Sequence, residues 1–209
     1  MTEEPDDALL TGGEPIAVGD FEWAPWRPDA LARRLAAVAT PWAVAGGWAV
    51  DLWLGHETRE HEDLEITVPR AGFGEVRDAL PDVEFDVIGA GQRWPIDSPA
   101  FDLLHQTWAR GADGVYVLDV FREPHEGETW IYRRDESLRR PIADVVRRTP
   151  DGIPFVAPEV LLLFKAKASR PKDEADALLV LPTLDAAQRV WLGAALDLVH
   201  PGHPWRVGL

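Results

Sequence analysis

The sequence contains no cysteine among its 209 residues. Disulfide bonds and thiolate metal sites are therefore excluded. It also lacks an apolar run long enough to span a membrane, and its first residues are acidic and carry no apolar signal core. From these absences we expect a soluble, cytoplasmic protein.

Basic residues are few, with 21 lysines and arginines against 36 aspartates and glutamates, and the formal net charge is −15. A general nucleic-acid binder holds phosphate with a surplus of basic side chains, so the charge disfavours that class and favours a cationic partner. Keeping the protein soluble explains the net charge at least as well. The sequence also lacks a Walker lysine motif after a strand and a Gly-x-Ser-x-Gly nucleophile elbow, which weakens two rival enzyme classes.

A chain of this length, with 46% hydrophobic residues, can form one large domain or a domain with a small helical appendage. We expect a flexible acidic lead over residues 1–20, an α/β domain over 21–153 and a C-terminal helical segment over 154–209. The fold class is α/β, more narrowly α+β, with flanking helices on a mixed β-sheet. The apolar spacing predicts strands over 42–45, 63–68, 83–88 and 115–121, a loop or hairpin over 89–98, and helices from Pro28 and over 48–54, 73–80, 173–181 and 186–198.

Two glycines, Gly46 and Gly47, form a turn at the start of a short helix that begins near Trp48. The first backbone N–H groups of a helix are free and lie at the positive end of its dipole, so they can hold an anion. This turn is a candidate cradle for phosphate.

Two acids, Asp63 and Glu65, follow on the next apolar strand. Alternate residues of a strand share a face, so these carboxylates are expected to lie about 6.7 Å apart. Carboxylate pairs of this kind bind one or two Mg²⁺ ions beside a nucleotide phosphate. The sequence thus predicts a metal site close to the phosphate cradle.

Asp119 is a single acid in the apolar strand predicted over 115–121. Such an acid is costly to bury unless it is paired, hydrogen-bonded or bound to metal. It could lie at a wet strand end or cap a turn. The presence of Asp63 and Glu65 upstream favours a third carboxylate in the same cleft.

Lys165 and Lys167 lie two residues apart on a predicted helix, so they cannot share one face and at most one is expected to reach a phosphate. We favour Lys165, which lies nearer the buried side, although most helix lysines are simply solvated. Lys172 and Asp176 have the spacing of an ordinary helical ion pair.

His61 invites two interpretations. A His-x-Asp grouping could bind zinc or iron, but a hydrogen bond that holds the acidic strand in place is the better interpretation. Most of the ten tryptophans are expected in the core, and Trp94 or Trp130 could stack on adenine or form the wall of a ligand site.

These segments together resemble the polymerase-β-like nucleotidyltransferase superfamily. Within it they are similar to the antibiotic nucleotidyltransferases that adenylylate aminoglycosides or lincosamides, including the aminoglycoside-2''-adenylyltransferases. The resemblance covers roughly residues 40–183. The sequence departs from the family pattern at two places. Glu65 stands where Asp is more usual, and Gly47-Trp48 replaces a Gly-Ser turn. The matching segments are Gly-Gly-Trp-Ala-Val-Asp at 46–51, then Gly55 and Arg59, His-Glu-Asp-Leu-Glu at 61–65, Leu-Asp-Val at 118–120, and residues 157–176.

The resemblance implies a nucleotidyltransferase-type sheet and an Mg²⁺-dependent transfer of AMP from ATP to a hydroxyl of a small, cationic acceptor such as an aminoglycoside. Asp119 would act as a metal ligand or as a general base. A homodimer is possible for proteins of this kind. The implied metal-binding and catalytic residues are Asp63, Glu65 and Asp119, and the implied nucleotide-binding residues are Gly46, Gly47, Trp48, Arg59, His61 and Lys165.

Two other functions stay open at this point. Glu65 and the missing turn serine are compatible with a non-catalytic nucleotide-binding or regulatory protein on the same scaffold. A toxin-like enzyme that nucleotidylates tRNA or protein is the other alternative. Its tRNA form fits poorly with the net charge, although a local basic patch of Arg133, Arg134, Arg139 and Arg140 could serve.

Overall fold

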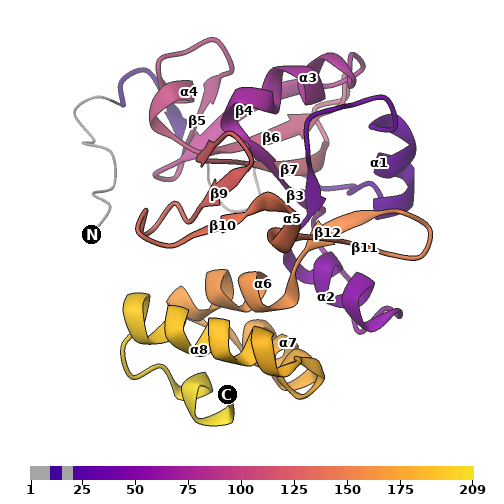
Figure 1. The fold of residues 1–209 in the computed structure, drawn as a ribbon. Helices are drawn as coiled ribbons and strands as arrows, with labels where there is room; N and C mark the ends of the chain where they lie inside the picture. Colours follow the sequence, from indigo (N-terminus) through magenta and orange to yellow (C-terminus); the bar gives the residue numbers. More distant parts are fainter. Residues whose placement is uncertain (1–9, 16–20) are drawn as a thin grey trace.

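The computed structural model describes residues 10–15 and 21–209. Within these residues a nine-stranded mixed sheet forms the framework, and the C-terminal helices lie together at one end of the molecule (Figure 1). The strands run in the order β1 (Glu14–Pro15), β5 (Gln92–Pro95), β4 (Glu84–Gly89), β6 (Gln106–Arg110), β7 (Tyr116–Glu123), β3 (Glu65–Pro69), β2 (Ala43–Val44), β12 (Pro154–Val156) and β11 (Val146–Arg148).

Helices flank this sheet, and a second, three-stranded sheet lies beside it among the described residues. The small sheet has the order β10 (Arg139–Pro141), β9 (Thr129–Ile131) and β8 (His125–Glu126). The helices are α1 (Pro28–Arg34), α2 (Gly46–Leu54), α3 (Phe73–Asp78), α4 (Ala100–Leu103), α5 (Ile142–Val145), α6 (Pro158–Lys165), α7 (Pro171–Val180) and α8 (Ala186–Val199). The mixed α/β fold expected from the sequence is confirmed.

Strands β3 and β7 form the centre of the sheet. They run parallel, and Glu65 is the register partner of Asp119 while Thr67 is the partner of Phe121. Paired residues of neighbouring strands point to the same face, so one face of this pair carries Glu65, Thr67, Asp119, Phe121 and, at the far end, Glu123.

Local sequence signals located several elements correctly. The helix that begins at Pro28 and the strand near Ala43 are present. The region 89–98 contains the hairpin of β4 and β5, whose turn residues Ala90 and Gly91 both have positive φ. Two successive residues with positive φ are typical of the type I′ turns that match the twist of paired strands.

The acidic strand differs from the expectation at its start. β3 begins at Glu65, so Asp63 lies two residues before the strand, and the strand spacing expected between the two carboxylates does not apply. The physical reason lies on both sides of the strand. β2 ends at Val44, where the chain turns into α2, and the first residues of β7 bond to residues 22–26 instead.

Helix α6 anchors the C-terminal helices to the sheet. All residues from Pro158 to Leu163 are buried, and the helix packs against α2 and α8. Its fully buried Glu159 accepts hydrogen bonds from Arg140 at 2.9 Å and from Gln188 at 2.8 Å. The acid therefore ties α6 to β10 on one side and to α8 on the other.

The domain boundaries predicted at residues 20 and 153 stay predictions. Most of the expected flexible lead falls on residues 1–9 and 16–20, which lie outside the described residues. In the part of the chain that is described, no helix combines the length and apolar character needed to cross a bilayer.

Candidate active site

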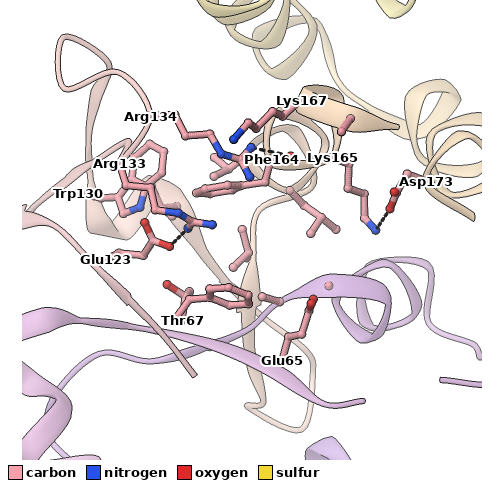
Figure 2. Close-up of a pocket in the computed structure, with 18 of the residues that line it drawn as sticks. Glu65, Thr67, Glu123, Trp130, Arg133, Arg134, Phe164, Lys165, Lys167 and Asp173 are labelled. Atoms are coloured by element: carbon pink, nitrogen blue, oxygen red, sulfur yellow. Dashed lines mark hydrogen bonds and ion pairs between the residues drawn. The ribbon is translucent and has the colours of Figure 1, made fainter. Parts of the chain in front are cut away.

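A cavity of about 430 Å³ lies between the β3–β7 face of the sheet and helix α6 (Figure 2). Its apolar walls include Phe121, Trp130 and Phe164. Its charged and hydroxyl-bearing lining residues are Glu65, Thr67, Glu123, Arg133, Arg134, Lys165, Lys167, Arg170 and Asp173.

Glu65 lines the cavity, whereas its register partner Asp119 is 3% exposed and, like Asp63, lies outside the lining. Burial and the charge of Asp63 raise the pKa of Glu65 to about 7, although Lys165 and nearby basic groups oppose the shift. Burial and the charge of Glu65 raise the pKa of Asp119 well above its usual value. Gln106 donates a hydrogen bond of 2.7 Å to Oδ2 of Asp119, and hydrogen bonding from Gln106 and from Trp108, its register partner on β6, opposes the rise in pKa.

This arrangement fits a hard divalent cation. Carboxylate oxygens are the ligands that Mg²⁺ prefers, and burial together with the neighbouring carboxylate raises the pKa values of Glu65 and Asp119, which a bound cation would oppose. Among the described residues, no group of three or more His, Asp or Glu side chains is already gathered closely enough to hold an ion.

Gly46 brings the start of helix α2 against this pair. Its φ is +60°, and a side-chain carbon added here would collide with Oε2 of Glu65. The residue before it, Ala45, makes no side-chain cap, so the first N–H groups of α2 lie beside the carboxylate and the cavity. Gly46 is therefore required both by its backbone conformation and by the close approach of Glu65.

Lys165 is the last residue of α6 and lines the cavity. Its ammonium group lies 2.9 Å from Oδ1 of Asp173 and 2.8 Å from Oδ2 of Asp176, and only 8% of its side chain is exposed. The lysine is therefore held in a fixed position by two acids of α7.

Two solved structures share this fold. The lincosamide antibiotic adenylyltransferase LnuA, solved with lincomycin bound, has a TM-score of 0.53 and 19% identity over 73% of this chain and 92% of its own. ANT(2'')-Ia, solved in complex with adenylyl-2''-tobramycin, has a TM-score of 0.55 and 16% identity over 80% of this chain and 93% of its own. At these identities the likeness supports the fold. No match to a curated protein sequence was found.

A family model supplies the link at the level of sequence. Residues 29–97 match the aminoglycoside-2''-adenylyltransferase family. The match includes the glycine turn at Gly46 and both acids, Asp63 and Glu65. The chain is a nucleotidyltransferase related to this family. This confirms the resemblance seen in the sequence.

Four residues expected to bind nucleotide lie outside the cavity lining of this nucleotidyltransferase. Gly47 packs so closely on Arg59 and His61 that a side chain at this position would collide with both. Nε2 of His61 lies 2.5 Å from Oδ2 of the buried Asp51, and its ring stacks on Trp48 at 4.4 Å between centroids. Their direct contact with nucleotide stays a prediction, and their visible contacts brace the loop before β3.

Which of the two lysines reaches a phosphate stays a prediction. Both line the cavity, although residues two apart on an α-helix do not share a face. The reason is a change of helix type, because α6 ends at Lys165 and a 3₁₀ turn covers Ala166–Ala168. The side-chain angles of an α-helix do not apply across this junction. The prediction that Lys172 pairs with Asp176 is wrong. Lys172 lies 3.4 Å from Glu62, and Asp176 pairs with Lys165.

No role in a nucleotide site was expected for Arg133, Arg134 or Glu123, yet all three line the cavity. Arg133 and Glu123 form an ion pair, and Arg134 donates a hydrogen bond of 2.8 Å to the carbonyl oxygen of Phe164. Trp130, one of the two tryptophans suggested as a ligand wall, also lines the cavity. The other, Trp94, is buried in a separate small cluster beside α4.

The cavity is basic although the molecule is acidic. Five basic side chains line it against three acidic ones, whereas the whole chain has a net charge of −15. The net charge of the chain therefore does not describe the charge of this cavity. Arg139 and Arg140 lie elsewhere and pair with Glu126 and Glu159, so the four arginines do not assemble into one patch.

Proposed function

We propose that this nucleotidyltransferase moves AMP from ATP to a hydroxyl of a small, cationic antibiotic of the aminoglycoside type, in a reaction that depends on Mg²⁺. One observation carries the proposal. The carboxyl groups of Glu65 and Asp119 are register partners on neighbouring strands, and Glu65 faces a basic cavity beside the start of helix α2. Metal-binding acids and phosphate-binding groups therefore meet at one place.

Asp63 and Glu65 would hold Mg²⁺, which when bound neutralises negative charge on the triphosphate. The basic residues Lys165, Lys167 and Arg170 line the cavity and would orient the β- and γ-phosphates, and the first N–H groups of α2 would add donors. These groups hold the leaving pyrophosphate in line with the attacking oxygen.

Asp119 acts on the acceptor. The acceptor oxygen forms a bond to the α-phosphorus, the bond to the β-phosphate oxygen breaks, and pyrophosphate leaves. The hydroxyl proton passes to the carboxylate of Asp119. A carboxyl group whose pKa is raised well above its usual value is a better proton acceptor than an ordinary aspartate.

The acceptor class rests on the family match and on the distribution of charge. Because the cavity lining is basic, it suits the triphosphate, and the acidic remainder of the surface suits a polycationic sugar. Lincosamides are the second acceptor class to test, since LnuA shares the fold.

Pyrophosphate release from ATP and Mg²⁺, measured against a panel of aminoglycosides and lincosamides, tests the proposal. Release should require one acceptor class and fall by at least about 100-fold in Asp63→Asn and Asp119→Asn. Asp78→Asn is the matched control, because Asp78 is an exposed acid on α3, and it should keep full activity. Nucleotide binding without release for any acceptor would contradict the transferase and favour the non-catalytic alternative.

A further inference from the structure

The end of the cavity away from Gly46 holds a buried acid that the proposed transfer does not use. Glu123 ends strand β7 and is 3% exposed. One of its oxygens pairs with Arg133, whereas Oε2 is buried without a hydrogen-bond partner. A buried acceptor left unsatisfied is destabilising, so Oε2 is ready to accept a hydrogen bond from a ligand.

The charge around Glu123 indicates which kind of hydrogen-bond donor can bind to it. Burial raises the pKa of this carboxyl group, while the charges of Arg133 and Arg134 act in the opposite direction. Arg133 already balances the carboxylate, and Lys167 adds a further basic group to the cavity. A second full cation is therefore disfavoured, and an uncharged N–H donor fits better.

The walls of this end are flat. The rings of Phe121, Trp130 and Phe164 line the cavity, and the guanidinium group of Arg133 lies 5.2 Å from the centroid of Phe121 and 4.6 Å from that of Phe164. Figure 2 shows Glu123, Arg133 and Trp130 together on the side of the cavity opposite Lys165 and Asp173. Aromatic and guanidinium planes are the surfaces on which nucleobases stack.

The distance to the reaction centre fits a nucleotide. Asp119 and Glu123 share a face of β7 and lie four residues apart, or about 13 Å along the strand. A nucleoside 5′-phosphate with its phosphate beside Glu65 and Asp119 can span this length. Its ribose then lies over Thr67 and Phe121, which are register partners on the same face.

We propose that the Glu123–Arg133 end of the cavity is the binding site for the adenine base of ATP, with Oε2 of Glu123 accepting a hydrogen bond from the 6-amino group. This assignment rests on the proposed function, because it takes ATP as the donor. It makes Glu123 a specificity-determining residue for the nucleotide.

The test compares two nucleotides that differ only at the group concerned. Binding of ATP and of purine riboside 5′-triphosphate, which has hydrogen in place of the 6-amino group, is measured by titration calorimetry with Mg²⁺ and without acceptor. The full-length chain should bind ATP at least about tenfold more tightly, as expected for a hydrogen bond to a charged group. In Glu123→Gln the ratio of the two dissociation constants should fall toward one.

Glu126→Gln is the matched control. Glu126 lies three residues further on, in β8, and pairs with Arg139 at the surface, where its side chain is 67% exposed. This variant should keep both dissociation constants. If Glu123→Gln does not fold, Glu123→Asp carries the same test, because it keeps a charge for Arg133 and withdraws the oxygen by one methylene group.

The outcomes separate this inference from the function on which it rests. Equal binding of the two nucleotides by the unmodified chain, or the same ratio in the chain and in Glu123→Gln, overturns the base site but leaves the transferase standing. Equal ratios would leave Glu123 with the single role of pairing with Arg133. Failure of both nucleotides to bind with Mg²⁺ overturns the proposed function as well.

Discussion

At the scale of single residues, the charge of Glu65 is the property most sensitive to solution conditions. Its pKa rises from a usual 4.5 to about 7, chiefly because the carboxyl group is buried and secondly because Asp63 lies nearby. The folded chain therefore binds a proton at this residue between about pH 4.5 and pH 7 that the unfolded chain has released. Stability must fall as the pH rises through this window.

We therefore expect a thermal unfolding midpoint lower at pH 8 than at pH 6, by about 3 °C or more, and a smaller difference in Glu65→Gln. Adding Mg²⁺ should stabilise the chain more at pH 8, because a cation binds the ionised carboxylate. Calorimetric melting with and without Mg²⁺ measures both effects. A midpoint that is independent of pH in the unmodified chain would contradict the raised pKa.

Gly46 yields a second residue-scale prediction. In Gly46→Ala the added methyl group would occupy the place of the Glu65 carboxylate, and alanine is strained at φ +60°. We expect a loss of about 1–2 kcal/mol in the free energy of unfolding from the backbone strain, together with loss of pyrophosphate release because Glu65 must move.

Gly74→Ala is the control for this substitution. Gly74 lies in α3, where a side-chain carbon would meet no atom within 4 Å. Alanine should be neutral or slightly stabilising there. Equal behaviour of the two variants in urea unfolding would show that Gly46 is not constrained by its surroundings.

At the scale of secondary-structure elements, α7 positions the lysine that α6 presents to the cavity. Asp173 and Asp176 both contact Lys165, and Arg170 donates a hydrogen bond of 2.8 Å to Asp173. Burial alone would raise the pKa of Asp173, but the hydrogen bonds from Arg170 and Lys165 hold it well below its usual value. The stability that this acid contributes is present above its usual pKa and is lost as the pH falls below it.

Asp176→Asn should weaken this junction. Asp176 is 1% exposed, and its loss leaves Lys165 with a single acid and Arg59 without its partner at 3.5 Å. We expect about 3 kcal/mol of destabilisation and an increased KM for ATP, measured by urea unfolding and by initial rates.

Asp197→Asn is the control for this substitution. It breaks the exposed pair with Arg206 and should cost at most about 1 kcal/mol. A similar cost for the two variants would contradict the positioning role.

The sequence could predict those elements whose signals are local. The helix starting at Pro28, the hairpin over 89–98 and the helices after Pro154 follow from periodicity, proline and glycine within a few residues. The short strands β9 to β12 span three residues each, too few for a period to show. Arg133 and Arg134 reach the cavity because the small sheet places the loop after β9 there, and nothing in their own neighbourhood indicates it.

The same limit applies to the carboxyl groups and the lysine. The sequence motifs identified Asp63, Glu65 and Asp119 as candidates, and the pairing of β3 with β7 makes two of them neighbours. Lys165 was identified from its position on a helix, but its partners depend on the way α7 folds back against α6. Spacing along the chain suggested Lys172 as the partner of Asp176, but tertiary packing pairs Asp176 with Lys165.

At the scale of the whole molecule, charge is distributed unevenly. A chain with net charge −15 encloses a cavity in which basic side chains outnumber acidic ones. Composition alone describes the surface and gives no information about this interior. Ligand chemistry therefore has to be inferred from the lining of the cavity.

This contrast determines how fast an anionic nucleotide arrives. At a distance the ligand meets the negative field of the whole protein and is repelled, and only within the cavity mouth does attraction prevail. Salt screens the long-range repulsion beyond about 10 Å at 0.1 M ionic strength, and it screens partly buried charges less.

We expect the association rate constant of ATP, measured by stopped flow, to increase between 10 and 100 mM salt. A decrease would show that the cavity field extends beyond its mouth. The acidic surface would thus act as a kinetic barrier to the donor while leaving the bound state strong.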